Sequence, residues 1–339
     1  MIRKSPQITS KFVAALTVVC GLVLAVGCSP QQNTQSPNGS QVITLQLNWR
    51  ADAQHGGFYA AQLLGEYKAE GLDVKIEQGG PGSPVIPNLV MGRVDFAIAN
   101  ADQILQVREQ DADIVGIMAP MQHSPRCIMV HQSSGIESLD QLKDITLAMN
   151  EGRTFAQVLK SKVDLTNVRV VPYSGTVAKF VLDEKYAQQG YVFSEPLVAR
   201  RQGSDPKALM VSELGFDPYT SVVAVNRKRL ESDPDLVRKF VAATVRGWEK
   251  YLQSPEATNR EINRINPEMD LESLDEAAVA IKPLCEMPTG QKFGTMTKPR
   301  WNELATQMAA VKAISGEPAE AASQAWSDVF EQAPAQNSP

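Results

Sequence analysis

The sequence is poor in the side chains that build metal centres. Among its 339 residues it has only 3 histidines and 4 cysteines. The histidines stand apart at positions 55, 123 and 131, and the chain contains no CxxC or HExxH motif. Because structural and catalytic zinc sites need several such ligands at characteristic spacing, we predict no metal site and no resident cofactor.

An excess of positive charge and a catalytic signature are also missing. The formal net charge is −5, with 43% hydrophobic and 21% charged residues. These are ordinary values for a globular protein and give no reason to expect binding to nucleic acid. No Ser-His-Asp, Cys-His or paired-acid pattern is present, so we predict that the chain is not an enzyme.

Only the N-terminal region has a long apolar run. Cationic residues at positions 3, 4 and 11 precede an apolar stretch over 12–24. That stretch is shorter than the roughly 20 residues that cross a bilayer, and it has the order of a secretory signal peptide. It ends in Leu24-Ala25-Val26-Gly27-Cys28, which resembles a bacterial lipobox. We therefore expect a signal peptide over 1–27 and a lipid on Cys28; an unlipidated signal peptide or an uncleaved anchor is the alternative.

Residues 28–40 are rich in Gln, Asn, Ser, Pro and Gly, which predicts a flexible tether. With Cys28 acylated, Cys127 and Cys285 are the remaining thiols of the mature chain. Their spacing does not demand a disulfide even in an oxidising compartment, so two buried free thiols are the favoured interpretation. A disulfide between them stays open.

The rest of the chain alternates between strand-like and helix-like segments. Strands are expected at 42–47, 72–76, 94–99, 114–121 and 127–130, with helices at 57–69, 85–91 and 101–110. The same order then returns, with strands at 145–149, 168–171, 190–193, 208–211 and 220–226 and helices at 154–162, 176–183 and 195–202. This alternation predicts an α/β fold with mostly parallel sheets.

The repeated order favours two lobes. Lobe 1 is expected over 41–127 plus 227–330, and lobe 2 over 128–226, with the chain crossing between them at 127–131 and 221–226. Residues 331–339 read as a disordered tail. A ligand would then lie in a cleft at the carboxyl ends of the strands of both lobes. One large doubly wound domain is the alternative.

Several short motifs point to a family. They are Asn48-Trp49, HGGFYAA at 55–61, GEYKAEGLDV at 65–74, GRVDFA at 92–97, SEP at 194–196, PDLV at 234–237 and RGW at 246–248. Together they resemble type-2 periplasmic binding proteins over residues 42–255. The most similar branch includes binders of thiamine pyrimidine precursors, alkylsulfonates, taurine and nitrate, and the fungal thiamine pyrimidine synthases. The resemblance implies a two-lobed venus-flytrap fold with two hinge strands and delivery of a ligand to an ABC importer.

Candidate ligand-binding residues follow the first strand. Asn48 and Trp49 come directly after it, and a flat indole suits a flat ring or a cation. His55 and Tyr59 lie near the start of the next helix, and the matching histidine of the pyrimidine-related branch favours a role for His55. Ordinary core packing is the alternative for Trp49 and Tyr59, and helix capping is the alternative for His55.

Further candidates follow later strands. Asn100 lies between a strand and a helix, where it can contact a ligand or act as a helix cap. Arg153 and Ser174 occupy the equivalent turns of the second lobe, which offer free amides to a polar or acidic ligand. Glu195 comes after the strand at 190–193, and we expect its carboxylate to accept hydrogen bonds from an amino group or an aminopyrimidine. The alternative for Glu195 is an ordinary helix-start residue before Pro196, and Arg126 and Arg153 favour an anion instead.

We therefore expect a solute-binding lipoprotein of an ABC importer, held at the periplasmic or cell-surface face of a bacterial membrane by its lipid. Its partners would be a small-molecule ligand and the importer permease, without nucleic acid, and we expect a monomer. The favoured ligand is a thiamine pyrimidine precursor or a similar amino-bearing heteroaromatic. Sulfonate, taurine or nitrate is the alternative. A synthase-like enzyme is a further alternative, although the Cys-rich iron motif of the fungal synthases is not found.

Overall fold

The computed structural model describes residues 41–330. The predicted signal peptide (1–27), the lipidation site Cys28, the tether (28–40) and the tail (331–339) lie outside the described residues. No helix within the described range is long and apolar enough to cross a membrane.

The described strands form two five-stranded sheets. The strands of the first sheet are β1 (Gln41–Gln46), β2 (Leu72–Glu77), β3 (Phe96–Ala99), β4 (Ile114–Met118) and β10 (Val222–Asn226). Their order is β2-β1-β3-β10-β4, with β1 parallel to both neighbours and β10 antiparallel to both of its own. Strand β4 is buried along its whole length, which explains its continuous apolar sequence IVGIM.

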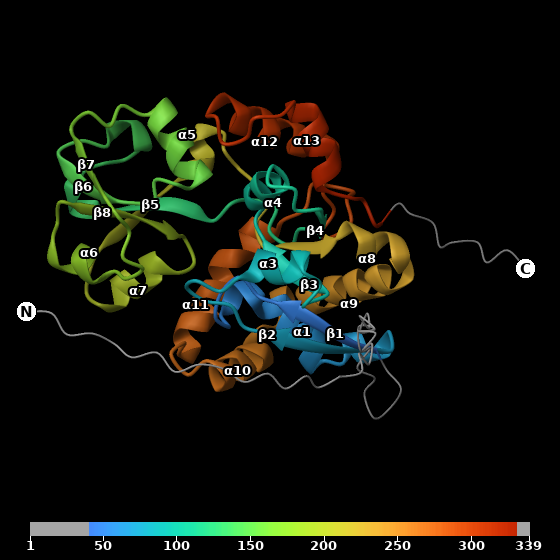
Figure 1. Cartoon of the computed structure of the whole chain (residues 1–339). Helices are drawn as coiled ribbons and strands as arrows, with labels where there is room; N and C mark the ends of the chain where they lie inside the picture. The colour runs from blue at the N-terminus through green and yellow to red at the C-terminus, as the bar shows by residue number, and fades with distance from the viewer. Residues whose placement is uncertain (1–40, 331–339) are drawn as a thin grey trace, which may run out of the picture. The chain divides into compact units, whose positions relative to one another are not determined.

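The second sheet repeats this arrangement and is coloured green in Figure 1. Its strands are β5 (Arg126–His131), β6 (Ile145–Ala148), β7 (Val168–Val171), β8 (Tyr186–Tyr191) and β9 (Pro206–Met210). The order is β7-β6-β8-β5-β9, and β5 is the strand that runs antiparallel to both neighbours. The repeated order of strands and helices in the sequence therefore corresponds to two sheets of the same topology.

The chain passes between the sheets twice. The predicted crossing strands at 127–131 and 221–226 fall largely within β5 and β10, each of which belongs to a single sheet. The passages come just before them, at 119–125 and 215–221, where Met121 and Thr220 form an antiparallel bridge. The Ser124 amide donates to the Asp217 carboxylate over 2.6 Å, which ties the two passages together. A segment that passes between the sheets has no ladder partners. The strand-like residues 127–131 and 221–226 are therefore the strands that the chain forms once it has reached the next sheet.

Helices follow the strands in both halves, and a helical region ends the described chain. The first group is α1 (Gly56–Leu63), α2 (Glu66–Ala69), α3 (Val85–Val90) and α4 (Ala101–Arg108). The second is α5 (Thr154–Lys162), α6 (Ala178–Leu182) and α7 (Glu195–Arg201). The last is α8 (Arg227–Ser232), α9 (Pro234–Gln253), α10 (Glu256–Ile265), α11 (Leu271–Ile281), α12 (Lys298–Ala310) and α13 (Pro318–Ala325).

Two local predictions need correction. The helix expected over 57–69 is two helices, because Gly65 adopts a left-handed φ of 77° between α1 and α2. The strand expected over 190–193 is β8, which begins four residues earlier. Gln188 and Gln189 in β8 are buried, and their polar side chains hid a central strand whose neighbours are β6 and β5.

Close helix packing supports the first sheet. A Cβ on Gly247 of α9 would meet the Gly57 carbonyl oxygen at 2.4 Å, and one on Gly57 would overlap the Trp248 ring. Glycine at both positions therefore lets α1 and α9 approach closely. Cys127 and Cys285 are buried free thiols, which confirms the favoured interpretation of this pair.

Candidate functional site

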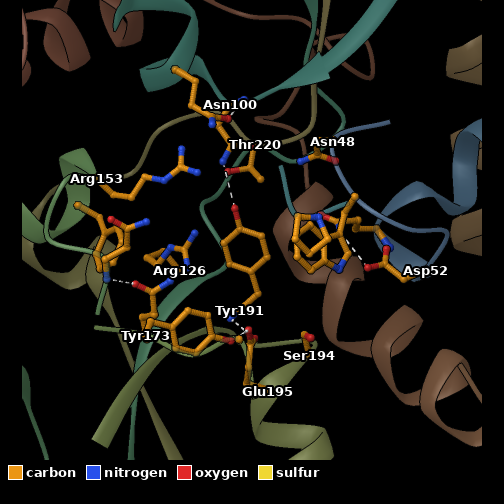
Figure 2. A pocket seen from close by; sticks show the side chains of 18 of the residues that line it. Asn48, Asp52, Asn100, Arg126, Arg153, Tyr173, Tyr191, Ser194, Glu195 and Thr220 are labelled. Atoms are coloured by element: carbon orange, nitrogen blue, oxygen red, sulfur yellow. Dashed lines mark hydrogen bonds between the residues drawn. The ribbon is translucent and has the colours of Figure 1, made fainter. Parts of the chain in front are cut away.

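A cavity of about 1050 Å³ is lined by residues from both sheets. Most of them follow the carboxyl ends of strands, among them Asn48 after β1, Asn100 after β3, Tyr173 after β7 and Glu195 after β8. Ligands of open α/β sheets bind at this end of the strands, because loops there present side chains and free amides. Figure 2 shows the side chains from both halves of the chain around this cavity.

The loop after β2 closes one wall next to Trp49. The Gly79 amide donates to the Trp49 carbonyl oxygen over 2.9 Å. A Cβ on Gly79 would meet the Leu47 carbonyl oxygen at 2.3 Å, so only glycine fits this approach. Trp49 itself is 44% exposed, so a large part of the residue stays uncovered. This leaves an indole face available at the cavity.

Asn100 and Tyr191 join the two halves of the cavity wall. The Asn100 Nδ2 group donates to the Tyr191 hydroxyl over 3.0 Å, as the dashed line in Figure 2 shows. The Asn100 Oδ1 atom accepts from the Ser221 amide over 3.3 Å. Ser221 lies in the second passage and has a φ of 55°. One side chain therefore contacts a passage between the sheets and the far wall of the cavity.

Arg126 is held by two aromatic rings. Its guanidinium carbon lies 4.2 Å from the centroid of the Tyr191 ring and 4.7 Å from that of Phe155. Such contacts fix a planar cation through the negative faces of the rings. Arg153, which precedes α5, also lines the cavity. Figure 2 shows both arginine side chains on the same side of the cavity as Tyr191.

Glu195 is already engaged by the protein. Its Oε1 atom accepts from the Tyr173 hydroxyl over 2.7 Å, and its Oε2 atom accepts from the Tyr191 amide over 2.7 Å. A Cβ on Gly190 would lie 3.1 Å from this carboxylate, so a glycine gives it room. Burial first, and then the negative charge of Glu195, raise the pKa of Tyr173 and keep its hydroxyl protonated as a donor.

Asp102, at the start of α4, adds a second carboxyl group to the lining. Burial raises its pKa, and the charges of Arg126 and Arg153 oppose that shift. The Asp102 carboxyl group therefore interacts electrostatically with the two arginines, although no ion pair within 4 Å joins them among the described residues.

The structure brings six of the eight predicted ligand residues to the cavity and leaves two outside its lining. Those that line it are Asn48, Trp49, Asn100, Arg153, Ser174 and Glu195. His55 is fully buried behind the wall, with Nε2 2.9 Å from Asn48 Oδ1 and Nδ1 3.2 Å from Asp52 Oδ1. Tyr59 is 3% exposed, and burial, followed by the charges of Asp52 and Glu261, raises its pKa.

Sequence reasoning overlooked several aromatic lining residues. Tyr173 is the second residue after the end of β7, and Tyr191 is the last residue of β8. The rule that selected Trp49, an aromatic residue at the end of a strand, applies equally to Tyr173. Tyr191 was hidden because the strand was expected to end at 193, whereas β8 ends at Tyr191. No group of three or more His, Cys, Asp or Glu that could hold a metal occurs in the part of the chain described.

Comparison with known proteins identifies relatives of this chain. A family profile described as NMT1/THI5 like matches residues 52–258, more than half of the chain. The riboflavin-binding protein RibY of Chloroflexus aurantiacus is 26% identical over 234 residues, which cover 64% of each chain, just under two thirds. The formylaminopyrimidine-binding protein of Halalkalibacterium halodurans is 21% identical over 304 residues, covering 85% of this chain and 91% of that protein.

An enzyme is also among the relatives. The 4-amino-5-hydroxymethyl-2-methylpyrimidine phosphate synthase THI11 of Saccharomyces cerevisiae is 24% identical over 248 residues, covering 67% of this chain and 72% of that protein. The sequence comparison by itself therefore includes both binding proteins and a synthase.

Solved structures share the fold. The putative periplasmic sulfonate-binding protein SsuA from Methylobacillus flagellatus matches with a TM-score of 0.63 and 12% identity, over 86% of this chain and 92% of that chain. The aliphatic sulphonate binding protein SsuA from Escherichia coli matches with a TM-score of 0.60 and 14% identity, over 80% and 85%. These likenesses show the fold alone, and they confirm the predicted two-lobed α/β architecture of periplasmic binding proteins.

Proposed function

Because this chain belongs to the NMT1/THI5-like family, we propose that it is the extracytoplasmic solute-binding component of an ABC importer and captures a flat heteroaromatic nutrient. The observation that carries the proposal is the cavity between the strand ends of the two sheets, with an exposed indole in its wall. Closure of two lobes around a ligand shifts an open–closed equilibrium, and the importer permease would read the closed form.

The size and lining of the cavity favour a ring over a small anion. A volume of about 1050 Å³ leaves room for a ring-bearing ligand, since ligand pockets of roughly 300–1,000 Å³ hold drug-sized molecules. Aromatic side chains line it, namely Trp49, Phe155, Tyr173, Tyr191, Phe193 and Phe216. Since Arg126 covers faces of Phe155 and Tyr191, Trp49 offers the most accessible face for stacking.

Two ring types are the first candidates. One is a thiamine pyrimidine precursor such as a formylaminopyrimidine, which is the ligand in the name of one relative. The other is a flavin, because a second relative is named as a riboflavin-binding protein. Glu195 would contribute to ring recognition mainly through Tyr173, because each of its oxygens already accepts a hydrogen bond from the protein. An amino group of the ligand would have to use the lone pairs that remain.

We propose a binding role rather than a synthase-like reaction. The fungal synthases that the sequence resembles act on a histidine of their own, and His55 is the matching residue here. Its imidazole is fully buried behind Asn48 and does not reach the cavity. The thiols of Cys127 and Cys285 are also buried, and burial raises the pKa of both, which disfavours the thiolate that binds iron.

A ligand panel tests the proposal. Thermal shift followed by calorimetry should show binding of riboflavin or of an aminopyrimidine, and weak or absent binding of taurine, alkylsulfonates and nitrate. Trp49→Ala should weaken ring binding by about 10-fold or more because it removes a stacking face, while Trp49→Phe should retain much of the affinity. Stabilisation by sulfonates alone would contradict the proposed ligand class.

Membrane attachment is tested outside the described residues. We propose that Cys28 is acylated after removal of residues 1–27, which would keep the protein at the membrane face. Cys28→Ser should abolish incorporation of a labelled fatty acid and release the protein from the membrane fraction. Cys20→Ser, within the apolar run, serves as the matched control and should change neither result. The monomeric state that we propose is checked by light scattering of the soluble part.

A further inference from the structure

Two cationic side chains in the cavity lack a partner of opposite charge at contact distance. Arg126 begins β5 and Arg153 precedes α5, so both come from the half of the chain that forms the second sheet. Within residues 41–330 neither guanidinium takes part in a salt bridge or a side-chain hydrogen bond. By contrast, Arg246 and Arg108 are each paired with carboxylates at 3.0 Å or less. Figure 2 shows both cavity arginines directed inward near Tyr191.

The surroundings of Arg126 restrict how it can bind. Tyr191 and Phe155 lie 4.2 and 4.7 Å from the guanidinium carbon, so the cation packs over two aromatic rings. None of the guanidinium N–H groups donates a hydrogen bond to another residue of the described range. In-plane N–H pairs match the two oxygens of a carboxylate or phosphate.

Nearby acidic groups do not neutralise this pair by contact. Glu195 directs its two oxygens to the Tyr173 hydroxyl and the Tyr191 amide. Asp52 accepts from the Gln54 amide and side chain and lies 3.2 Å from His55. Burial raises the pKa of Asp102, and the charges of Arg126 and Arg153 oppose this rise. Both guanidinium groups therefore lack a contacting carboxylate among the described residues, although Asp52, Asp102 and Glu195 also line the cavity.

We propose that Arg126 and Arg153 form an anion subsite of the cavity, which binds a carboxylate or phosphate group attached to the captured ring. This inference rests on the proposed function, because it assumes that a ring occupies the cavity. The arginines supply in-plane donors and charge from one half of the chain, while Trp49 supplies a stacking face from the other. The ligand class is then an acidic heteroaromatic compound.

The experiment compares probes that differ in one property. Neutral rings are represented by riboflavin and hydroxymethylpyrimidine, and their acidic counterparts by flavin mononucleotide and hydroxymethylpyrimidine phosphate. Inorganic phosphate and an alkylsulfonate carry the anion without a ring. Calorimetry on the soluble chain at low and high ionic strength measures each dissociation constant. We expect at least one acidic ring to bind about 10- to 100-fold more tightly than its neutral counterpart, with the advantage falling at high salt.

Variants assign the effect to the pair. Arg153→Gln should remove most of the preference for the acidic ring over its neutral counterpart. Arg169→Gln removes the same charge from an exposed position of β7 outside the lining and should not change this preference. Arg126→Gln, checked for folding by thermal denaturation, should act in the same direction as Arg153→Gln.

The outcomes separate the two proposals. Equal binding of neutral and acidic rings, or a preference that survives Arg153→Gln, would overturn the anion subsite and leave the proposed function standing. Equally tight binding of ring-free anions would overturn the flat-ring ligand, and with it the subsite as a site for an acidic ring. If no ring and no anion bound, both proposals would be lost.

Discussion

At the scale of single residues, Glu195 acts within the protein as much as toward a ligand. Its carboxylate accepts from Tyr173 and Tyr191, two of the aromatic residues that line the cavity. A carboxylate with two strong donors holds both in place. The aromatic wall of the second half of the cavity is therefore organised around one charged side chain.

Tyr173→Phe should lower the free energy of unfolding by about 1–2 kcal/mol, because it removes a donor from a partly buried carboxylate while keeping the ring. Urea denaturation measures the change. Tyr186→Phe is the matched control, since its hydroxyl makes no hydrogen bond among the described residues. Equal losses in the two variants would show that the Glu195 contact contributes nothing specific.

Placement after a strand predicted the lining residues well, and proximity in sequence predicted them poorly. Asn48, Trp49 and Asn100 line the cavity because the carboxyl ends of β1 and β3 open onto it. His55 and Tyr59 lie only a few residues further on but point elsewhere. The orientation of α1 depends on its close packing against α9, which involves residues almost two hundred positions away. Local pattern carries no information on such a contact.

At the scale of elements, α2 and α9 are joined by ion pairs. Arg246 Nε donates to Glu66 Oε2 over 2.6 Å, Arg246 Nη2 donates to Glu70 over 2.8 Å, and Lys250 donates to Glu66 Oε1. Hydrogen bonds from Lys250 and then Arg246 lower the pKa of Glu66 against the opposing effect of burial. A lowered pKa in the folded state stabilises the fold above the unfolded-state pKa, and the stabilisation is lost as the pH falls through the folded-state pKa.

Glu66→Gln should therefore cost about 1 kcal/mol at neutral pH, a modest value because Arg246 and Lys250 are 38% and 51% exposed and screened by solvent. The difference from the unaltered protein should narrow as the pH falls below about 4.3. Denaturation as a function of pH measures it. Glu77→Gln, which removes an exposed pair with Lys75, controls for the lost carboxylate. A difference that stayed constant down to acid pH would contradict this account.

The element predictions succeeded where apolar periodicity was strong and failed where polar residues are buried. Strand β4 was recognisable from its apolar run, but β8 contains Gln188 and Gln189 in a central position. Gln189 Oε1 accepts from the Asn150 amide over 2.6 Å, so a tertiary contact satisfies a side chain that sequence alone assigns to the surface. Such compensation is invisible before the second sheet is assembled.

At the scale of the whole molecule, the Asn100–Tyr191 hydrogen bond spans the cavity wall. Tyr191→Phe removes it and retains the ring that packs on Arg126. Because one such bond contributes about 0.5–1.5 kcal/mol, the form in which the two residues meet should lose roughly two- to tenfold in relative population. Stopped-flow measurement should show faster ligand dissociation with little change in association. Tyr59→Phe, outside the lining, should leave ligand dissociation unchanged. If both variants released the ligand equally fast, the Asn100–Tyr191 hydrogen bond would have no specific role in holding it.

The two-lobed architecture followed from the repeated order of strands and helices and from the family motifs. The exact passages did not, because strand propensity continues up to the point where each strand enters a sheet. Only the ladders show that β5 pairs with β8 and β9, and that β10 pairs with β3 and β4. Sequence periodicity predicts that a segment is a strand, but it does not predict which strands pair with it.

The position of β10 in the first sheet affects the order in which the two sheets can fold. All strands of the second sheet come from one continuous stretch, from Arg126 in β5 to Met210 in β9. In the first sheet β3 and β4 are not neighbours, since β10 lies between them. A chain that emerges N-terminus first can therefore complete the second sheet while the first still has an open gap. The earliest-synthesised strands must wait with unpaired edges until residue 226 emerges, which makes that interval the period when chaperone protection matters most.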